Sequence, residues 1–133
     1  MTEFTNDSKK RGAIDRLVGA FGYSWAGFRH AVLNEAAIRD EFILFCILTP
    51  VSLALNITGI ERLILVLSML LVLLVEFLNT AIETTLDRIS TQQHPLTGRA
   101  KDLGSAAVFI ALMMSALSWV AIVGPILVRS VRD

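Results

Sequence analysis

Apolar and polar positions alternate along this chain in a way that predicts helices throughout. From Ala13 to Ala36 apolar residues recur at helical spacing while polar residues occupy the opposite side, which predicts an amphipathic helix over residues 13–36. Arginines and broad aromatic side chains on such a helix favour the plane of a membrane interface. The alternative is a helix that packs against a partner protein.

Three continuous apolar runs follow this helix. We predict membrane spans over residues 42–57, 63–86 and 103–128, the first of them short for a bilayer. The polar segment STQQHPLT, residues 90–97, predicts a loop between the second and third spans. The expected fold is an all-α membrane protein, with an amphipathic amino-terminal surface helix and three transmembrane helices in a single domain over residues 1–133.

Composition and charge support this arrangement and orient it. Hydrophobic residues make up 54% of the chain and the mean hydropathy is +0.64, above the range of ordinary soluble domains. The 12 basic and 12 acidic residues cancel, but the basic ones precede the first span or lie between the second and third far more often than elsewhere. The positive-inside rule therefore predicts a cytoplasmic amino terminus and an external carboxyl terminus.

The second predicted span carries a polar face. In VEFLNTAIETTLDR, residues 75–88, helical spacing brings Glu76, Asn79, Thr80, Glu83 and Asp87 to one side. An ionisable side chain inside a bilayer costs roughly 2.5–3.5 kcal/mol on insertion scales, so this stripe indicates function. Asp87, at the helix end, is expected to be structural. The alternative is that the carboxylates only tie helices together.

The carboxylates of this polar face are predicted to lie at different depths in the membrane. Glu83 is predicted about one turn from the cytoplasmic end of its span, at the level of Glu35, and two carboxylates with open positions suit Mg²⁺ shared with nucleotide phosphates. Pairing of each with an arginine is the alternative. Glu76 lies about 10 Å deeper. A carboxylate held there near a lipid hydroxyl is a candidate general base, with Asn79 as the candidate residue that orients it or the substrate.

The segment GRAKDLGSAA, residues 98–107, is expected where the loop becomes the third span. A helix amino terminus beside Lys101 favours phosphate, although lysine next to a span is also an ordinary topology marker. Further along, Ala107, Ala111 and Ser115 recur every four residues, which predicts close helix packing.

Missing motifs narrow the function. The chain has no GxxxxGK[ST] phosphate loop, no GxGxxG motif and no HRD or DFG set, which argues against the soluble nucleotide-binding folds. Three spans and one surface helix enclose too little volume for a buried polar stripe. We therefore expect an oligomer with its carboxylates at shared interfaces.

Three stretches resemble the small integral-membrane prokaryotic diacylglycerol kinases: GYSWAGFRHAVLNEAAIRDE at residues 22–41, VEFLNTAIETTLDR at residues 75–88 and HPLTGRAKDLGSAAV at residues 94–108. The E-x-x-N-x-x-x-E pattern from Glu76 to Glu83 is the most specific part. The resemblance implies a homotrimer of three-span subunits with shared active sites in the bacterial cytoplasmic (inner) membrane. It also implies transfer of the γ-phosphate of MgATP to the hydroxyl of diacylglycerol, giving phosphatidic acid.

The resemblance implies roles for individual residues as well. Glu76 would be the general base with Asn79 in support, while Glu35 and Glu83 would hold the Mg²⁺ that bridges the ATP phosphates. Besides these two carboxylates, the implied nucleotide contacts are Arg16, Tyr23, His94, Lys101 and Asp102. Besides Glu76, the implied lipid contacts are Arg16, Ser24, Trp25, Arg29, Glu41, Ser105 and Trp119.

Other functions stay open at this point. Related members of this family phosphorylate undecaprenol, and the catalytic residues do not distinguish the two substrates, although GRAKDLGSAA is more similar to the diacylglycerol type. A small ion-coupled transporter that uses Glu76 as an intramembrane proton or cation site is the alternative from another class. A non-enzymatic membrane assembly factor is a third.

Overall fold

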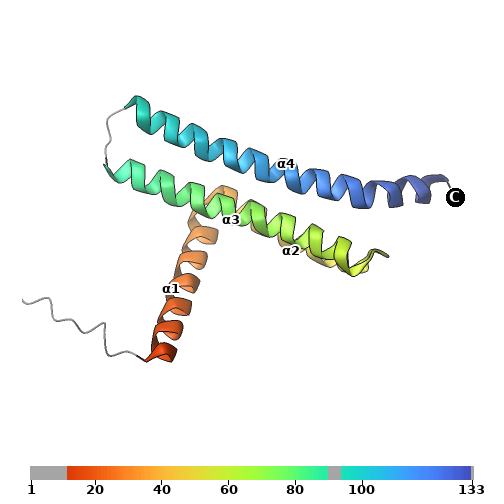
Figure 1. Cartoon of the computed structure of the whole chain (residues 1–133), viewed down its shortest axis with the longest axis horizontal. Coiled ribbons are helices and arrows are strands. Elements are labelled where there is room, and N and C mark those ends of the chain that lie inside the picture. Colours follow the sequence, from red (N-terminus) through yellow and green to blue (C-terminus); the bar gives the residue numbers. More distant parts are fainter. Residues whose placement is uncertain (1–11, 90–93, 133) are drawn as a thin grey trace, which may run out of the picture.

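The computed structural model of the chain describes residues 12–89 and 94–132. The helices in this part are α1 (Ala13–Asn34), α2 (Ala36–Ala54), α3 (Gly59–Ile89) and α4 (Pro95–Arg132). Figure 1 shows α3 and α4 side by side and antiparallel, with α2 behind α3 and α1 standing across them. The packing is most extensive between α3 and α4, and α2 also packs along α3. The predicted all-helical class is confirmed.

The helix boundaries differ from the predicted ones at the polar ends. The helix α3 extends beyond the predicted 63–86 on both sides, and α4 begins eight residues before 103. The predicted loop over residues 90–97 is therefore wrong in its last part, because Pro95 already begins α4, while residues 90–93 lie outside the described residues, as does the tail 1–11. An apolar window detects only the bilayer-like part of a helix, so its polar end turns escape detection.

Two of the described helices, α3 and α4, are long and apolar enough to cross a membrane. Helix α2 has 19 residues and ends at Ala54 rather than at the predicted residue 57. Its charged residues Arg39, Asp40 and Glu41 all lie in the first two turns, so the remaining apolar part is shorter than a usual span. The assignment of α2 as a span therefore stays a prediction.

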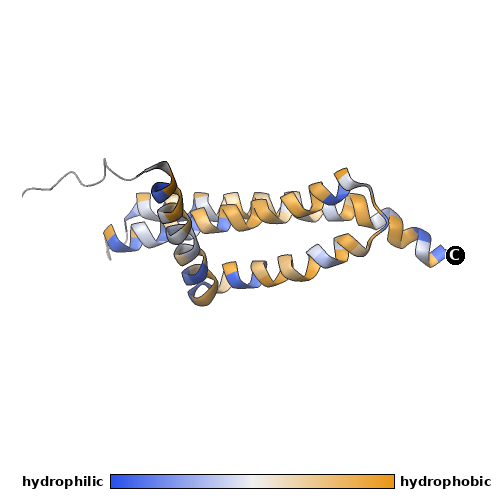
Figure 2. Ribbon diagram, turned by 90° about the horizontal axis from the view of Figure 1, so that it is seen from below, coloured by the Kyte–Doolittle hydropathy of each residue, from blue (hydrophilic) through white to orange (hydrophobic). Residues whose placement is uncertain are grey.

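One face of α3 forms the centre of the packed chain. The buried apolar residues of this helix are Leu65, Met69, Val72 and Leu73, at helical spacing. Most other large apolar side chains are exposed in the single chain, and Figure 2 shows apolar residues along most of α2, α3 and α4. Such a surface requires either lipid or further subunits around it.

The turn between α2 and α3 is fixed by polar contacts at both helix ends. Arg62 donates from Nε to the Ser52 carbonyl at 3.0 Å and from a terminal nitrogen to the Leu55 carbonyl at 3.2 Å. The Thr58 N–H donates to Glu61 Oε2 at 2.8 Å, and the Glu61 N–H donates to Thr58 Oγ1 at 3.2 Å. This reciprocal pair is a capping box that starts α3. Its hydrogen bonds hold the pKa of Glu61 below its ordinary value.

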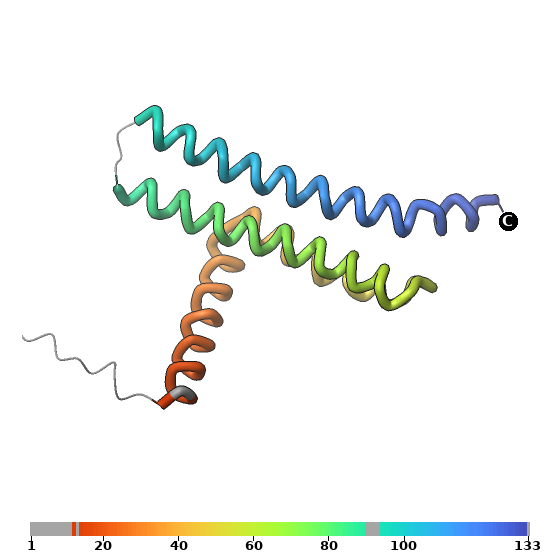
Figure 3. The backbone as a smooth tube through the Cα atoms, in the orientation of Figure 1, coloured from red at the N-terminus to blue at the C-terminus, as the bar shows by residue number. Residues whose placement is uncertain are grey.

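An aromatic cluster joins α1 to α2 and α3. Phe28 of α1 packs edge-on against Phe42 of α2, with ring centroids 5.1 Å apart, and stacks on Phe77 of α3 at 5.8 Å. Trp25 stacks on Phe28 at 6.2 Å. Beyond Phe77, α3 continues for about 18 Å to its end at Ile89. Figure 3 shows the resulting α3–α4 hairpin projecting past α1.

Candidate active site

The polar face of α3 runs from buried to exposed. Glu76 and Asn79 are 7% and 8% exposed, Glu83 is half-buried, and Asp87 near the helix end is exposed. The four residues follow the spacing of three and four that places side chains on one face. Burial is deepest where α2 and α4 both lie against α3, so the carboxylates meet progressively more water toward the hairpin tip.

Asn79 interacts with Glu83 rather than with Glu76. Its Nδ2 donates to Glu83 Oε1 at 3.3 Å, while its Oδ1 is buried without a hydrogen-bond partner among the described residues. The sequence predicted that Asn79 orients either Glu76 or the substrate, and no hydrogen bond joins Asn79 to Glu76 in the described part of the chain. Asn79 instead restrains the carboxylate one turn nearer the hairpin tip.

Glu76 has a buried carboxylate, and one of its oxygens can still accept a hydrogen bond. Its Oε2 has no hydrogen-bond partner among the described residues, and it lies one position before Phe77 of the aromatic cluster. Within residues 12–89 and 94–132, the one ion pair joins Lys101 to Asp87. The alternative that Glu35 and Glu83 each pair with an arginine therefore finds no support in these residues.

Lys101 and Asp87 join α4 to α3 near the hairpin tip. Lys101 Nζ donates to Asp87 Oδ1 at 2.6 Å, and this hydrogen bond raises the pKa of the Lys101 ammonium above its ordinary value. Sequence reasoning treated Asp87 as a structural end residue and missed this contact. Asp87 lies four residues after Glu83 on the stripe, and that spacing was the available signal.

The amino terminus of α4 is not where the sequence placed it. The helix begins at Pro95, so Lys101 lies in its second turn, and proline at the first helical position explains the early start. His94 caps this end, since its Nδ1 accepts from the Leu96 N–H at 3.2 Å and its carbonyl accepts from the Gly98 N–H at 3.2 Å. The N–H groups of Leu96, Thr97 and Gly98 therefore all bond to His94. Lys101 contributes charge from further along the helix.

Glu35 occupies the corner between α1 and α2. It is the single residue between the two helices, its backbone is extended, and its N–H donates to the Ala31 carbonyl at 2.8 Å. The predicted α1 contacts are all exposed: Arg16, Tyr23, Ser24, Trp25 and Arg29. In one chain, α1 meets α3 through the stacked Phe28 and Phe77 rather than through these side chains.

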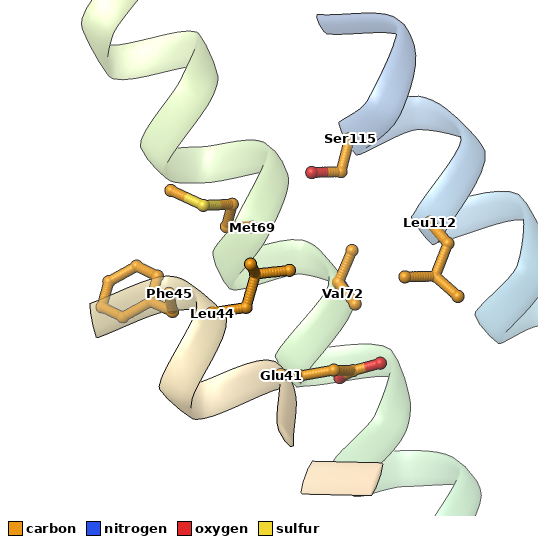
Figure 4. Close-up of a pocket in the computed structure, with 7 residues that line it drawn as sticks. All are labelled: Glu41, Leu44, Phe45, Met69, Val72, Leu112 and Ser115. Carbon is orange, nitrogen blue, oxygen red and sulfur yellow. The ribbon is translucent and has the colours of Figure 1, made fainter. Parts of the chain in front are cut away.

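Glu41 lines a small, mostly apolar cavity between α2, α3 and α4. The cavity has a volume of about 40 Å³ and is lined by Glu41, Leu44, Phe45, Met69, Val72, Leu112 and Ser115 (Figure 4). Glu41 is one of the implied lipid contacts, and its carboxylate faces the middle of α3 and α4. Its Oε2 has no partner among the described residues.

The two remaining predicted lipid contacts lie on α4. Trp119 is partly exposed, and its indole Nε1 is buried without a hydrogen-bond partner in the described part of the chain, whereas Ser105 is exposed. Asp102, a predicted nucleotide contact, is exposed one residue after Lys101. The fold thus brings Glu76, Asn79, Glu83 and Lys101 to the α3–α4 pair and leaves the α1 residues apart from them.

Comparison with known proteins gives a consistent result. The model of a family described as prokaryotic diacylglycerol kinase matches residues 22–123. The diacylglycerol kinase of Escherichia coli strain K12 is 45% identical over 104 residues, which cover 78% of this chain and 85% of that protein. The diacylglycerol kinase of Haemophilus influenzae is 46% identical over 110 residues, covering 83% and 93%. That of Pseudomonas aeruginosa is 44% identical over 114 residues, covering 86% and 93%.

Proposed function

Because the chain belongs to the prokaryotic diacylglycerol kinase family, we propose that it transfers the γ-phosphate of MgATP to the hydroxyl of diacylglycerol and releases phosphatidic acid. The observation that carries this proposal is the line of polar groups on α3. Glu76 is a buried carboxylate with one oxygen that has no partner among the described residues, and it lies two turns from the half-buried carboxylate of Glu83, on the same helix that carries the contact with Lys101. The two ends of this line suit a lipid acceptor and a charged donor.

A divalent metal fits the donor groups. The described residues contain no group of three or more His, Cys, Asp or Glu side chains that could hold a metal by themselves. Mg²⁺ does not need one, because it is usually held by one or two carboxylates together with substrate phosphates and water. Asn79 occupies only Oε1 of Glu83, and Glu35 offers a second hard carboxylate. When bound, the metal would neutralise charge on the transferring phosphate.

Individual residues of the chain take separate roles in the phosphoryl transfer. Glu76 accepts the proton of the lipid hydroxyl while that oxygen bonds to the γ-phosphorus, and the bond from γ-phosphorus to the bridging oxygen of ADP breaks. Lys101, with a raised pKa, stays protonated and compensates phosphate charge. His94 and Asp102 are assigned to the nucleotide on the same segment, and Arg16 and Tyr23 would reach it from the α1 helix of a neighbouring subunit.

The aromatic cluster supports a position for the reaction relative to the bilayer. If α1 lies in the membrane interface with a cytoplasmic amino terminus, its stacking of Phe28 on Phe77 puts Glu76 at the interface level. Glu83 and Lys101 then lie in the part of the hairpin that projects into the cytoplasm. Glu76 would therefore be shallower than the sequence suggested, where a glycerol hydroxyl and an aqueous nucleotide can meet. The carboxyl terminus of α4 would lie outside.

A homotrimer would complete the site. In one chain Arg16, Tyr23, Ser24, Trp25 and Arg29 are exposed on α1, away from the polar face of α3. An α1 helix from a neighbouring subunit can bring such residues to that face. Glu76, Asn79 and Trp119 each have a buried polar atom with no partner in residues 12–89 and 94–132, and a ligand or a neighbouring subunit would satisfy these atoms.

The experiment that tests the proposal is a transfer assay with two acceptors. Radiolabel from the γ-position of ATP is followed into lipid in mixed micelles containing diacylglycerol or undecaprenol. We expect transfer to diacylglycerol. Preferential transfer to undecaprenol would assign the other substrate class of the same fold, and no transfer to either alcohol would refute the kinase assignment.

A further inference from the structure

Gly104 of α4 lies against the side chain of Asn79 of α3. A Cβ atom built on Gly104 would overlap Asn79 Oδ1 and lie 3.2 Å from its Cγ. This contact is specific to Gly104. The glycines with nothing within 4 Å of such a Cβ are Gly19, Gly22, Gly27, Gly59, Gly98 and Gly124.

Position 104 requires a glycine because of limited space and not because of its backbone conformation. No glycine in the described residues has a positive φ, and Gly104 lies inside the regular helix α4. Glycine within a helix is unfavourable relative to alanine, since it has more conformational freedom to lose on folding. The position therefore carries a local cost in helix stability, and what it provides is room for the Asn79 carboxamide.

The carboxamide of Asn79 is held on two sides. Its Nδ2 donates to Glu83 Oε1 at 3.3 Å, while its Oδ1 faces the bare Cα of Gly104. The side chain is 8% exposed, so it has little room to rotate away. A Cβ at position 104 would displace this amide and disrupt its hydrogen bond to Glu83.

The register of α3 and α4 keeps Gly104 opposite Asn79. Ser68 and Ser115 face each other with their Oγ atoms 3.3 Å apart, about three helical turns from the Asn79–Gly104 contact. Ala111 is 3% exposed between these two contacts. The small residues Gly104, Ala111 and Ser115 thus lie toward α3, whereas Ala107 is exposed in the single chain.

We propose that Gly104 is a positioning residue for the phosphate-donor half of the site. Its missing side chain leaves the space in which Asn79 holds Oε1 of Glu83, so that the second carboxylate oxygen of Glu83 would be free to hold the metal of the bound nucleotide. This inference rests on the proposed function, because it assigns Glu83 to that metal. It adds a residue of α4 that acts through Asn79 without touching the ligand.

The test measures metal binding directly, on the full-length protein in detergent micelles. Mn²⁺ with a non-hydrolysable ATP analogue is titrated by electron paramagnetic resonance into wild type, Gly104→Ala, Asn79→Ala and the double variant. Loss of a group that orients a metal ligand typically weakens metal binding about 10- to 100-fold. We expect Gly104→Ala to show such a loss while its KM for diacylglycerol stays unchanged. Gly124→Ala, the same substitution in open space on α4, should bind as wild type.

The double variant separates positioning from general damage. Without the carboxamide there is nothing for the new Cβ to displace, so Gly104→Ala should add no further loss in the Asn79→Ala background. This comparison also holds if Gly104→Ala alone fails to fold. Wild-type Mn²⁺ affinity in Gly104→Ala, or an equal additional loss in the Asn79→Ala background, would overturn the proposal. Wild type that binds no Mn²⁺–nucleotide at all would instead refute the proposed function.

Discussion

Lys101 donates a hydrogen bond from Nζ to Asp87 Oδ1 at 2.6 Å, and this contact links α4 to α3 at the open end of the hairpin. Both side chains are partly or largely exposed, at 38% for Lys101 and 66% for Asp87. An ion pair in water adds little to stability. Its consequence is geometric, because it holds the ammonium group on the side of α3 that carries Glu83.

Substitution of Asp87 is expected to weaken nucleotide binding without unfolding the protein. In Asp87→Asn the Lys101 side chain loses its charged partner and its fixed direction. We expect KM for MgATP to rise by up to about tenfold, or about 1.4 kcal/mol, because the ammonium group that compensates phosphate charge is no longer fixed beside Glu83. Steady-state kinetics measure the change and thermal unfolding checks the fold. If Asp87 acts only through Lys101, the double variant Lys101→Met, Asp87→Asn should have the same KM for MgATP as Lys101→Met alone. A further rise in KM in the double variant would contradict this coupling.

Substitution of Glu76 is expected to remove the chemical step and to leave nucleotide binding intact. Glu76→Gln keeps the size of the side chain but cannot accept the proton of the lipid hydroxyl. General base catalysis contributes about 10²- to 10⁴-fold, so kcat should fall at least about 100-fold. Binding of Mn²⁺–nucleotide should match wild type, because Glu76 lies two turns from Glu83. A variant that keeps more than half of its turnover would exclude Glu76 as the base.

Mixing of inactive subunits tests whether sites are shared. Glu35 lies at the α1–α2 corner and Glu76 lies on α3. If one site takes α1 and α3 from different chains, a mixture of Glu35→Gln and Glu76→Gln subunits contains some sites with both glutamates intact. Such a mixture should therefore regain part of the activity. The variants are unfolded together, refolded in micelles and assayed as kinases. Glu83→Gln mixed with Glu76→Gln is the control, since both carboxylates lie on the same helix and no site regains both. Equal recovery in the two mixtures would contradict this arrangement.

Removal of Arg62 is expected to destabilise the turn between α2 and α3. Its guanidinium caps the carbonyls of Ser52 and Leu55 at the end of α2. Hydrogen bonds of charged groups contribute about 1.5–3 kcal/mol each, so loss of both in Arg62→Met should lower the free energy of unfolding by about 3 kcal/mol or more. Denaturant unfolding in micelles measures this loss. Arg129→Met, at an exposed position near the end of α4, should leave the stability unchanged.

The sequence by itself determined the helices and the composition of the site. Hydropathy and helical spacing are local properties, so they predicted an all-α membrane protein and placed Glu76, Asn79 and Glu83 on one face of a helix. The same local reasoning failed at helix ends, where Pro95 and the polar residues after it carry no apolar signal.

Only the tertiary structure decided which of these side chains meet. On one helix Asn79 has Glu76 one turn to one side and Glu83 one turn to the other, and spacing does not choose between them. Gly104 leaves room for the Asn79 amide that bonds Glu83, and Lys101 finds Asp87, because α4 packs against α3 in one register. A contact between residues distant in the chain depends on that packing, and no local pattern in either segment contains it.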